Sequence, residues 1–266
     1  MARYKVIPAA LPDAEVIDWA ELKAQYEQGS IDLFVVLGPT ASGKTKYAVA
    51  LARALGNAEI ISADSRQVYR GMDIGTGKDL GEYGDIPYHI IDIADAGEQY
   101  NVFEFQQDFL KAYQDIRSRG VIPILCGGTG MYINAVTAGY DFRSKSALSE
   151  TRGPNTRPGF PQKPYFIGTL VSREVRNERI DRRLDERLRE GMIEEIDSLI
   201  KGGVSPEKLI SYGLEYKYIT LYLLGELSLE EAREKLAIAI HQFAKRQMTW
   251  FRGMERSGVR IHWVEV

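Results

Sequence analysis

Short apolar runs alternate along the chain with longer segments whose apolar residues recur every three or four positions. Residues 31–37 form a near-continuous apolar run, which is typical of a strand buried on both faces of a parallel sheet. Shorter runs predict further strands at residues 58–62, 88–93, 121–126, 165–171 and 259–264. Strands that alternate with helices in this way indicate the α/β class, a parallel sheet covered by helices.

Helical periodicity fills most of the intervals between these runs. Apolar positions at helical spacing predict helices at residues 18–28, 44–55, 102–119 and 174–201. Ser228-Leu229-Glu230-Glu231 forms a capping box, which predicts a further helix from there to about residue 252. The C-terminal third is therefore expected to be largely helical.

One internal segment shows neither the strand-like nor the helical spacing of apolar residues. Residues 143–163 are polar and proline-rich, which is typical of a loop or linker. The predicted organisation is an N-terminal extension (1–30), an α/β core (31–142), this linker (143–163) and a C-terminal part that returns one strand and several helices to the core (164–266).

Composition narrows the class of protein. The 266 residues are 44% hydrophobic, enough to bury a sizeable core, and a single cysteine, Cys126, excludes an internal disulfide framework. No run resembles a signal peptide or approaches the length of a membrane span, so a cytoplasmic location is expected. The net charge of −3 means that a nucleic-acid partner would need a local basic face.

The run from Gly38 to Thr45, Gly-Pro-Thr-Ala-Ser-Gly-Lys-Thr, is a complete phosphate-binding loop (P-loop) between a predicted strand and a predicted helix. Its glycines let backbone N–H groups point at phosphate oxygens, Lys44 can reach the outer phosphate, and the Thr45 hydroxyl can hold Mg²⁺. The N-terminus of the following helix also favours an anion. Most such loops hold ATP or GTP together with an aspartate at the end of a neighbouring strand. Asp92 is an ambiguous candidate for that aspartate.

Two further loops follow predicted strands, at the edge where parallel sheets bind ligands. Asp64 would face the ligand, although an aspartate at such a position more commonly caps the segment that follows it. Arg66 and Gln67 carry heads suited to a base edge or a phosphate. After the fourth strand, the glycine-rich residues 127–130 supply the hydroxyl of Thr129.

Five ordered motifs together resemble the tRNA dimethylallyltransferase (isopentenyl-tRNA transferase) family: GPTASGKT, ADSRQVYRGMDIGTGK, HIIDI, GGTGMYINA and AKRQMTWFR. The resemblance covers about residues 33–140 and 165–263. It implies a P-loop NTPase-like fold and transfer of a dimethylallyl group from dimethylallyl diphosphate to N6 of an adenine next to a tRNA anticodon. Mg²⁺ is the implied cofactor, and dimethylallyl diphosphate and tRNA are the implied partners.

The resemblance also implies roles for individual residues. Asp64 matches the family's base, Thr129 a threonine near the reacting atoms, and Arg173 an arginine that binds the diphosphate. Asp64, Ser65, Arg66 and Gln67 match the stretch that touches the tRNA. The diphosphate is expected on Gly38, Thr40, Ala41, Ser42, Gly43, Lys44 and Thr45, with Lys44 also stabilising the leaving group.

Two segments of the C-terminal part carry weaker signals. Arg179, Arg183 and Arg187 fall on one line of the predicted helix, either as an anion-binding face or as a solvated face with ion pairs. Four residues of the last motif are expected to pack the last helix against the core: Lys245, Arg246, Gln247 and Trp250. Arg246 could also reach phosphate.

The chain departs from the family at one place. Family members carry a helical insertion after the segment that corresponds to residues 140–142, and this chain has the linker there instead. An alternative function is therefore prenyl transfer to free AMP, ADP or ATP, which needs no anticodon grip. Two further interpretations are a small-molecule kinase and a non-catalytic RNA- or nucleotide-binding protein. A monomer is the working expectation for the oligomeric state.

Overall fold

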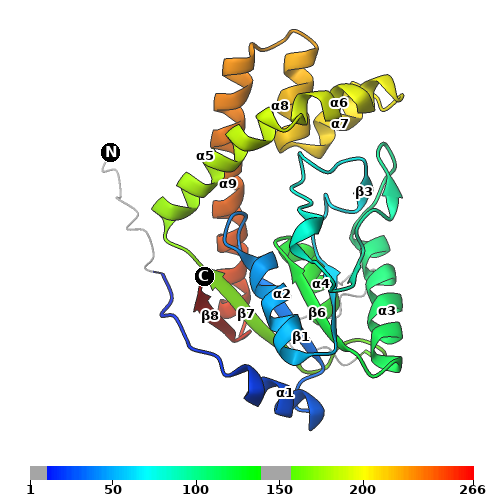
Figure 1. Ribbon diagram of the computed structural model, residues 1–266, viewed down its shortest axis with the longest axis vertical. Coiled ribbons are helices and arrows are strands. Elements are labelled where there is room, and N and C mark those ends of the chain that lie inside the picture. Colours follow the sequence, from blue (N-terminus) through cyan, green and yellow to red (C-terminus); the bar gives the residue numbers. More distant parts are fainter. Residues whose placement is uncertain (1–10, 139–156) are drawn as a thin grey trace.

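The computed structural model describes residues 11–138 and 157–266, shown in Figure 1. The strands are β1 Leu33–Leu37, β2 Ala58–Ser62, β3 Tyr69–Arg70, β4 Tyr88–His89, β5 Ala94–Asp95, β6 Ile122–Gly127, β7 Pro164–Leu170 and β8 Ile261–Glu265. The helices are α1 Trp19–Glu27, α2 Lys44–Leu55, α3 Val102–Ser118, α4 Gly130–Thr137, α5 Arg173–Arg189, α6 Met192–Lys201, α7 Pro206–Tyr212, α8 Leu214–Leu223 and α9 Leu229–Arg256, with the short 3-10 helix η1 at Leu80–Glu82.

A six-stranded parallel sheet forms the centre of the fold, in the order β4-β2-β6-β1-β7-β8. The P-loop strand β1 lies between β6 and β7, so the loop that follows it emerges in the middle of the carboxyl edge. This arrangement confirms the predicted α/β fold, and the parallel strands place all of their following loops on one side.

Alternate residues of β1 belong to two different cores, as period-2 geometry requires. Leu33, Val35 and Leu37 pack in a core that includes α3, α4 and α9. Phe34 and Val36 pack on the other face, in a core that includes α1 and α2. The apolar run is continuous because helices cover both faces of the strand.

The C-terminal helices α5 to α8 form a layer beyond the carboxyl edge of the sheet, and the long helix α9 joins that layer to the sheet (Figure 1). Helix α9 packs against α5 and α8 at one end and against α4 nearer the sheet. The cavity described below lies between the sheet edge and this helical layer.

The predicted strand at residues 88–93 is only partly present. Tyr88 and His89 pair with β2, and then Ile90 and Asp92 adopt positive φ angles of 61° and 55°. These left-handed residues turn the chain out of the sheet. Ala94 and Asp95 pair instead with β3 in a separate two-stranded ribbon.

The single helix predicted at residues 174–201 is wrong. Helix α5 ends at Arg189, Gly191 takes φ +104°, and α6 begins at Met192. The apolar stripe continues through the break because both helices face the same core, so periodicity alone does not reveal the glycine turn. Helices α4, α7 and α8 were not predicted.

Part of the predicted linker is described. Residues 143–156 lie outside the described residues, while residues 157–163 form turns that lead into β7. The amides of Gln162 and Lys163 donate hydrogen bonds of 2.6 and 3.0 Å to the Asp32 carboxylate, which joins the end of this segment to the start of β1. Of the predicted N-terminal extension, residues 11–30 are described; Glu15 bonds through its amide to the Trp263 carbonyl on β8.

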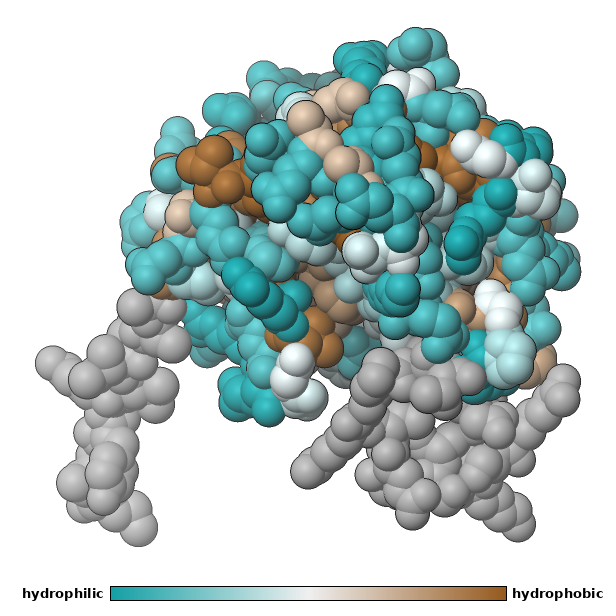
Figure 2. Space-filling view, turned by 90° about the horizontal axis from the view of Figure 1, so that it is seen from below, coloured by the Kyte–Doolittle hydropathy of each residue, from teal (hydrophilic) through white to brown (hydrophobic). Residues whose placement is uncertain are grey.

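Hydrophilic side chains cover most of the face shown in Figure 2, with apolar residues in separate small patches. Among the helices in the described part of the chain, none is long and apolar enough to cross a membrane.

Candidate active site

The P-loop connects β1 to α2 in a conformation that depends on its glycines. A Cβ at Gly38 would lie 2.2 Å from Thr169 Oγ1 and 2.5 Å from Ser42 Oγ, so only glycine fits between the loop and β7. Gly43 takes φ 80° at the start of α2, and Ala41 takes φ 61°. The loop therefore curves tightly over the N-terminus of α2, where the helix dipole favours an anion.

Most of the predicted phosphate-binding residues line one cavity of about 1300 Å³: Thr40, Ala41, Gly43, Lys44 and Thr45. Ser42 does not, because its buried hydroxyl lies 2.6 Å from Thr169 Oγ1 on β7. Gly38 lies beneath the loop rather than in the cavity wall. The structure thus gives Gly38 and the Ser42 side chain a packing role.

Lys44 lies in the cavity wall with its pKa lowered by burial, an effect that the nearby Asp64 carboxylate opposes. A partly desolvated cation beside the backbone N–H groups of a P-loop interacts more strongly with an anion than a solvated one would. This wall of the cavity is suited to a diphosphate.

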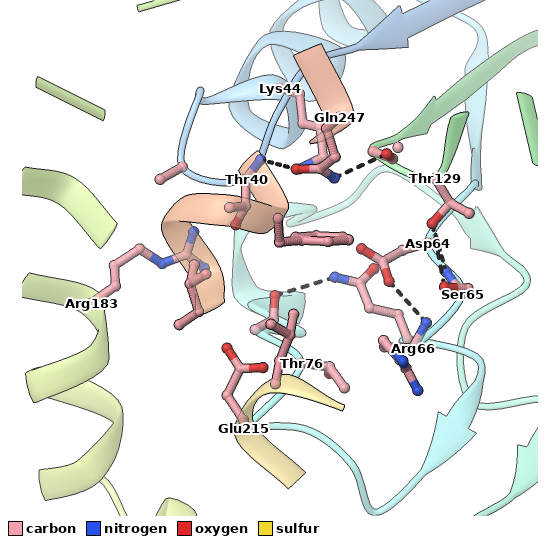
Figure 3. A pocket seen from close by; sticks show the side chains of 18 of the residues that line it. Thr40, Lys44, Asp64, Ser65, Arg66, Thr76, Thr129, Arg183, Glu215 and Gln247 are labelled. Carbon is pink, nitrogen blue, oxygen red and sulfur yellow. Dashed lines mark hydrogen bonds between the residues drawn. The ribbon is translucent and has the colours of Figure 1, made fainter. Parts of the chain in front are cut away.

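The neighbouring wall carries Asp64, in the loop after β2, and Thr129, just after β6 (Figure 3). The Asp64 carboxylate accepts the Arg66 amide at 2.9 Å, so the residue both caps the following turn and faces the cavity. The Thr129 hydroxyl accepts the Ser65 amide at 3.1 Å. The two loops are thus held together, and both interpretations of Asp64 apply at once.

Arg66 and Gln67 also line the cavity. The Arg66 guanidinium lies 5.6 Å from the centre of the Tyr212 ring, a cation–π contact with α7. The amide group of Gln67 donates to the Gly77 carbonyl at 3.3 Å and accepts from the Ser62 hydroxyl at the same distance. Tyr212 is a cavity residue that no motif or period in the sequence singles out.

Some of the arginines of α5 line the cavity and others do not. Arg179, Arg183 and Arg187 line the cavity, together with Arg182, which the helical spacing does not place on that line. Their partners are mostly distant in sequence: Arg183 lies 3.2 Å from Asp79 and Arg187 3.8 Å from Glu215.

Arg173 is the first residue of α5; it is exposed and is not one of the cavity-lining residues. Burial, and then the neighbouring Arg187, lower the pKa of Arg183, which marks it as the desolvated cation among the α5 arginines that line the cavity. Arg183 therefore lies at the cavity, whereas Arg173 does not.

Asp92 is a candidate acid partner for the P-loop by sequence, and the structure assigns it elsewhere. Its carboxylate bonds to the buried ammonium group of Lys78, which also bonds to Asp73 at 2.7 Å. This cluster holds the turns around β3 and β5. Glu215, in contrast, reaches the cavity from the start of α8, and burial raises its pKa, opposed chiefly by Arg187.

Gln247 on α9 bridges the two walls (Figure 3). Its Oε1 accepts the Thr40 amide at 2.8 Å, and its Nε2 donates to the Gly128 carbonyl at 2.9 Å. A Cβ at Gly128 would lie 2.3 Å from Nε2, so the bridge also requires that glycine. The sequence predicts a packing role here, and the packing proves to be a specific connection between the P-loop and the Thr129 loop.

Trp250 lies one turn further along α9, against Gly130 at the start of α4, where a Cβ would lie 2.2 Å from its ring. It adds an apolar surface to the cavity next to Thr129.

Comparison with known proteins gives the family. A family model described as IPP transferase matches residues 67–157 and 143–254, and one described as isopentenyl transferase matches residues 31–83. A tRNA dimethylallyltransferase of Parabacteroides distasonis is 49% identical over 89% of this chain and 93% of its own length; one of Syntrophotalea carbinolica is 46% identical over 88% and 94%. Among solved structures, a tRNA isopentenylpyrophosphate transferase from Bacillus halodurans matches with a TM-score of 0.74 and 34% identity over 88% of this chain and 89% of that one.

The Parabacteroides alignment runs over 286 positions although it includes only 89% of this 266-residue chain, so that relative carries several dozen residues that this chain lacks. The two segments that match the IPP transferase model meet at residues 143–157, where the sequence predicts a missing insertion. Identity of this level over nine-tenths of both proteins, with the cavity just described, leads to one conclusion: the chain belongs to the IPP transferase family.

Proposed function

We propose that this protein transfers a dimethylallyl group from dimethylallyl diphosphate to N6 of an adenine in tRNA, next to the anticodon, and releases diphosphate. The relatives named tRNA dimethylallyltransferase support the substrate class. The observation that carries the proposal is the single cavity with a cationic P-loop wall at Lys44 and a carboxylate–hydroxyl wall at Asp64 and Thr129. A volume of about 1300 Å³ can hold both a prenyl diphosphate and an adenine displaced from its stack.

The acceptor nitrogen needs help because its lone pair is delocalised into the purine ring. The Asp64 carboxylate takes one N6 proton while the nitrogen forms a bond to the first carbon of the dimethylallyl group. Thr129, bonded to the loop that carries Asp64, keeps that loop in place. The bond between this carbon and the diphosphate oxygen breaks at the same stage.

The leaving diphosphate gains negative charge as its bond to carbon breaks. Backbone N–H groups of the P-loop, the Lys44 ammonium group and the Arg183 guanidinium stabilise that charge without rearranging, because the fold has already positioned them. Arg173 lies outside the cavity and plays no part in this step.

Mg²⁺ fits this site through oxygen atoms alone. In residues 11–138 and 157–266 there is no cluster of three His, Cys, Asp or Glu side chains that could hold a metal ion. The Thr45 hydroxyl lines the cavity and is the protein oxygen that would hold the ion, with diphosphate oxygens as further ligands. When bound, the ion supplies charge neutralisation for the leaving group.

The test is a transfer assay with labelled dimethylallyl diphosphate and Mg²⁺, offered either unmodified tRNA or AMP. We expect label in tRNA; label in AMP alone would favour the free-nucleotide function instead. Asp64→Asn should reduce transfer by at least about 100-fold, a general-base loss. Asp85→Asn, an exposed carboxylate paired with Arg53, is the matched control and should leave transfer unchanged. Full activity of Asp64→Asn would refute the assignment of the base.

The cytoplasmic location and the monomeric state stay predictions. Cell fractionation and sedimentation of the purified chain measure them directly.

A further inference from the structure

One wall of the cavity is a loop that pairs with no strand of the sheet. The Asp73–Asp79 loop follows β3 and leads into η1, and its residues Gly75, Thr76, Gly77 and Asp79 line the cavity. A loop without ladder hydrogen bonds needs another source of order if it is to present a fixed surface.

A carboxylate outside the cavity adds to the order that the ion pairs of Lys78 with Asp73 and Asp92 give this loop. Glu195 lies on α6 and is not a cavity-lining residue. Its Oε2 accepts the amides of Asp73 and Ile74 at 2.8 and 2.6 Å, and its Oε1 accepts the Gly75 amide at 3.1 Å. Three consecutive amides that converge on one group form a concave anion site, which an ionised carboxylate satisfies and a neutral amide side chain cannot.

Tyr216 on α8 completes the arrangement. Its hydroxyl donates to Glu195 Oε1 at 2.7 Å, and burial followed by the Glu195 charge raises its pKa, so the proton stays on the hydroxyl. A Cβ at Gly75 would lie 2.8 Å from the Tyr216 ring. The loop is thus pressed against α8 at the residue where the third amide bond forms.

The fixed loop in turn positions two side chains that the proposed reaction uses. The Gly77 carbonyl accepts Gln67 Nε2 at 3.3 Å, and the Asp79 carboxylate accepts Arg183 Nη2 at 3.2 Å. At Gly77 a Cβ would lie 1.8 Å from the guanidinium group of Arg187, so this α5 side chain reaches the loop at Gly77. Movement of the loop would displace a residue matched to tRNA contact and a cation of the diphosphate wall together.

We propose that Glu195 is a positioning residue that fixes the Asp73–Asp79 loop and thereby presents Gln67 and Arg183 to the two substrates. This role rests on the proposed function. The groups nearest the reacting atoms, Lys44, Asp64 and Thr129, lie on the P-loop and on the loops after β2 and β6, and Glu195 touches none of them. Loss of the Glu195 charge is therefore expected to weaken substrate binding more than the chemical step.

The first measurement does not depend on activity. Hydrogen–deuterium exchange of the full chain should show faster exchange at the amides of residues 73–75 in Glu195→Gln, with the strands of the sheet as protected as in the wild type. Glu194→Gln changes the neighbouring carboxylate, which is exposed, and is the matched control. Unchanged exchange at residues 73–75 would overturn the proposal whatever reaction the protein performs.

The second measurement is steady-state kinetics of transfer to tRNA. We expect KM for both substrates to rise about tenfold in Glu195→Gln, with kcat within about threefold of the wild type, since the loss is one of binding. Tyr216→Phe, which keeps the three amide bonds, should give a smaller rise. If Glu195→Gln does not fold, Gly75→Ala tests the same loop from the α8 side and should give the same KM pattern.

Faster exchange with unchanged KM values, or a fall in kcat alone, would overturn the positioning role. Absence of transfer in the wild type would count against the proposed function instead, and the exchange experiment would still decide whether Glu195 orders the loop.

Discussion

Replacement of Gln247 by methionine tests whether a side chain on α9 holds the two walls of the active site at a fixed separation. Methionine has a similar length and volume, so the change removes the hydrogen bonds without opening a cavity. The Thr40 amide loses its acceptor and the buried Gly128 carbonyl its donor. Because Thr40 is only partly buried, we expect a loss of about 2–3 kcal/mol in the free energy of unfolding, below the full penalty for two buried groups.

That loss corresponds to a fall of roughly 5–10 °C in Tm for a chain of this size. The effect on catalysis should be larger than the effect on folding, because the prenyl diphosphate is expected on the Thr40 side and the adenine on the Gly128 side. We expect kcat/KM for transfer to tRNA to fall by about 10- to 100-fold, as a displacement of about 1 Å between reacting groups would cause.

Thermal unfolding and steady-state transfer assays measure the two effects, with Gln114→Met on the exposed face of α3 as the matched control. Gln247→Glu separates the two bonds, since it keeps an acceptor for Thr40 and removes the donor to Gly128. If Gln247→Met is less stable but keeps the wild-type kcat/KM, the bridge contributes to folding alone and the reasoning about wall separation is wrong.

Three further predictions concern the site and the sheet. Arg183→Gln should raise KM for dimethylallyl diphosphate by about tenfold or more, while Arg173→Gln should change that KM by less than about twofold. A larger rise in Arg173→Gln than in Arg183→Gln, measured by titration with this substrate, would favour Arg173 as the diphosphate ligand. Ser42→Ala should lower the free energy of unfolding by about 1–2 kcal/mol with little change in the KM of the prenyl donor, because its hydroxyl faces β7, and a large KM change would show that it contacts the ligand. Hydrogen bonds from Arg119 lower the pKa of Glu59 from 4.5 to about 2. The stability that these bonds provide is therefore fully present above pH 4.5, the unfolded-state pKa, and is lost as the pH falls toward the folded-state pKa of about 2. Glu59→Gln should therefore cost about 1–2 kcal/mol at pH 7, allowing for the exposure of Arg119, and urea titrations should show that deficit shrink below about pH 4.5.

The features that local sequence determines were predictable. The bounds of α2 and β2 agree with the prediction, because each is a short segment with one clear period between glycine or polar boundaries. Asp64 and Thr129 both line the cavity, since residues that follow parallel strands meet at the same edge, and their catalytic roles stay predictions.

The features that depend on contacts between distant segments were not predictable. Arg173 and Arg183 are both arginines on the same helix, and only the packing of α5 over the Asp73–Asp79 loop decides which one reaches the cavity. Gln247 bonds to two residues that are each more than a hundred positions away from it in the sequence, and no local pattern distinguishes it from a packed glutamine. Gly191 ends a helix whose apolar stripe continues beyond it.

The position of β1 at the centre of the sheet has a consequence for folding during synthesis. The strand that carries the P-loop leaves the ribosome early, but its two neighbours, β6 and β7, are encoded about 90 and 130 positions later. Contacts between residues so far apart in the sequence form slowly, because the entropy of the intervening chain is lost before the strand pairing stabilises the structure. Gln247, which joins the two walls, is encoded later still. The binding cavity is therefore completed only after most of the chain has emerged, and a nascent chain that stops before α9 has no assembled site with which to capture a prenyl diphosphate.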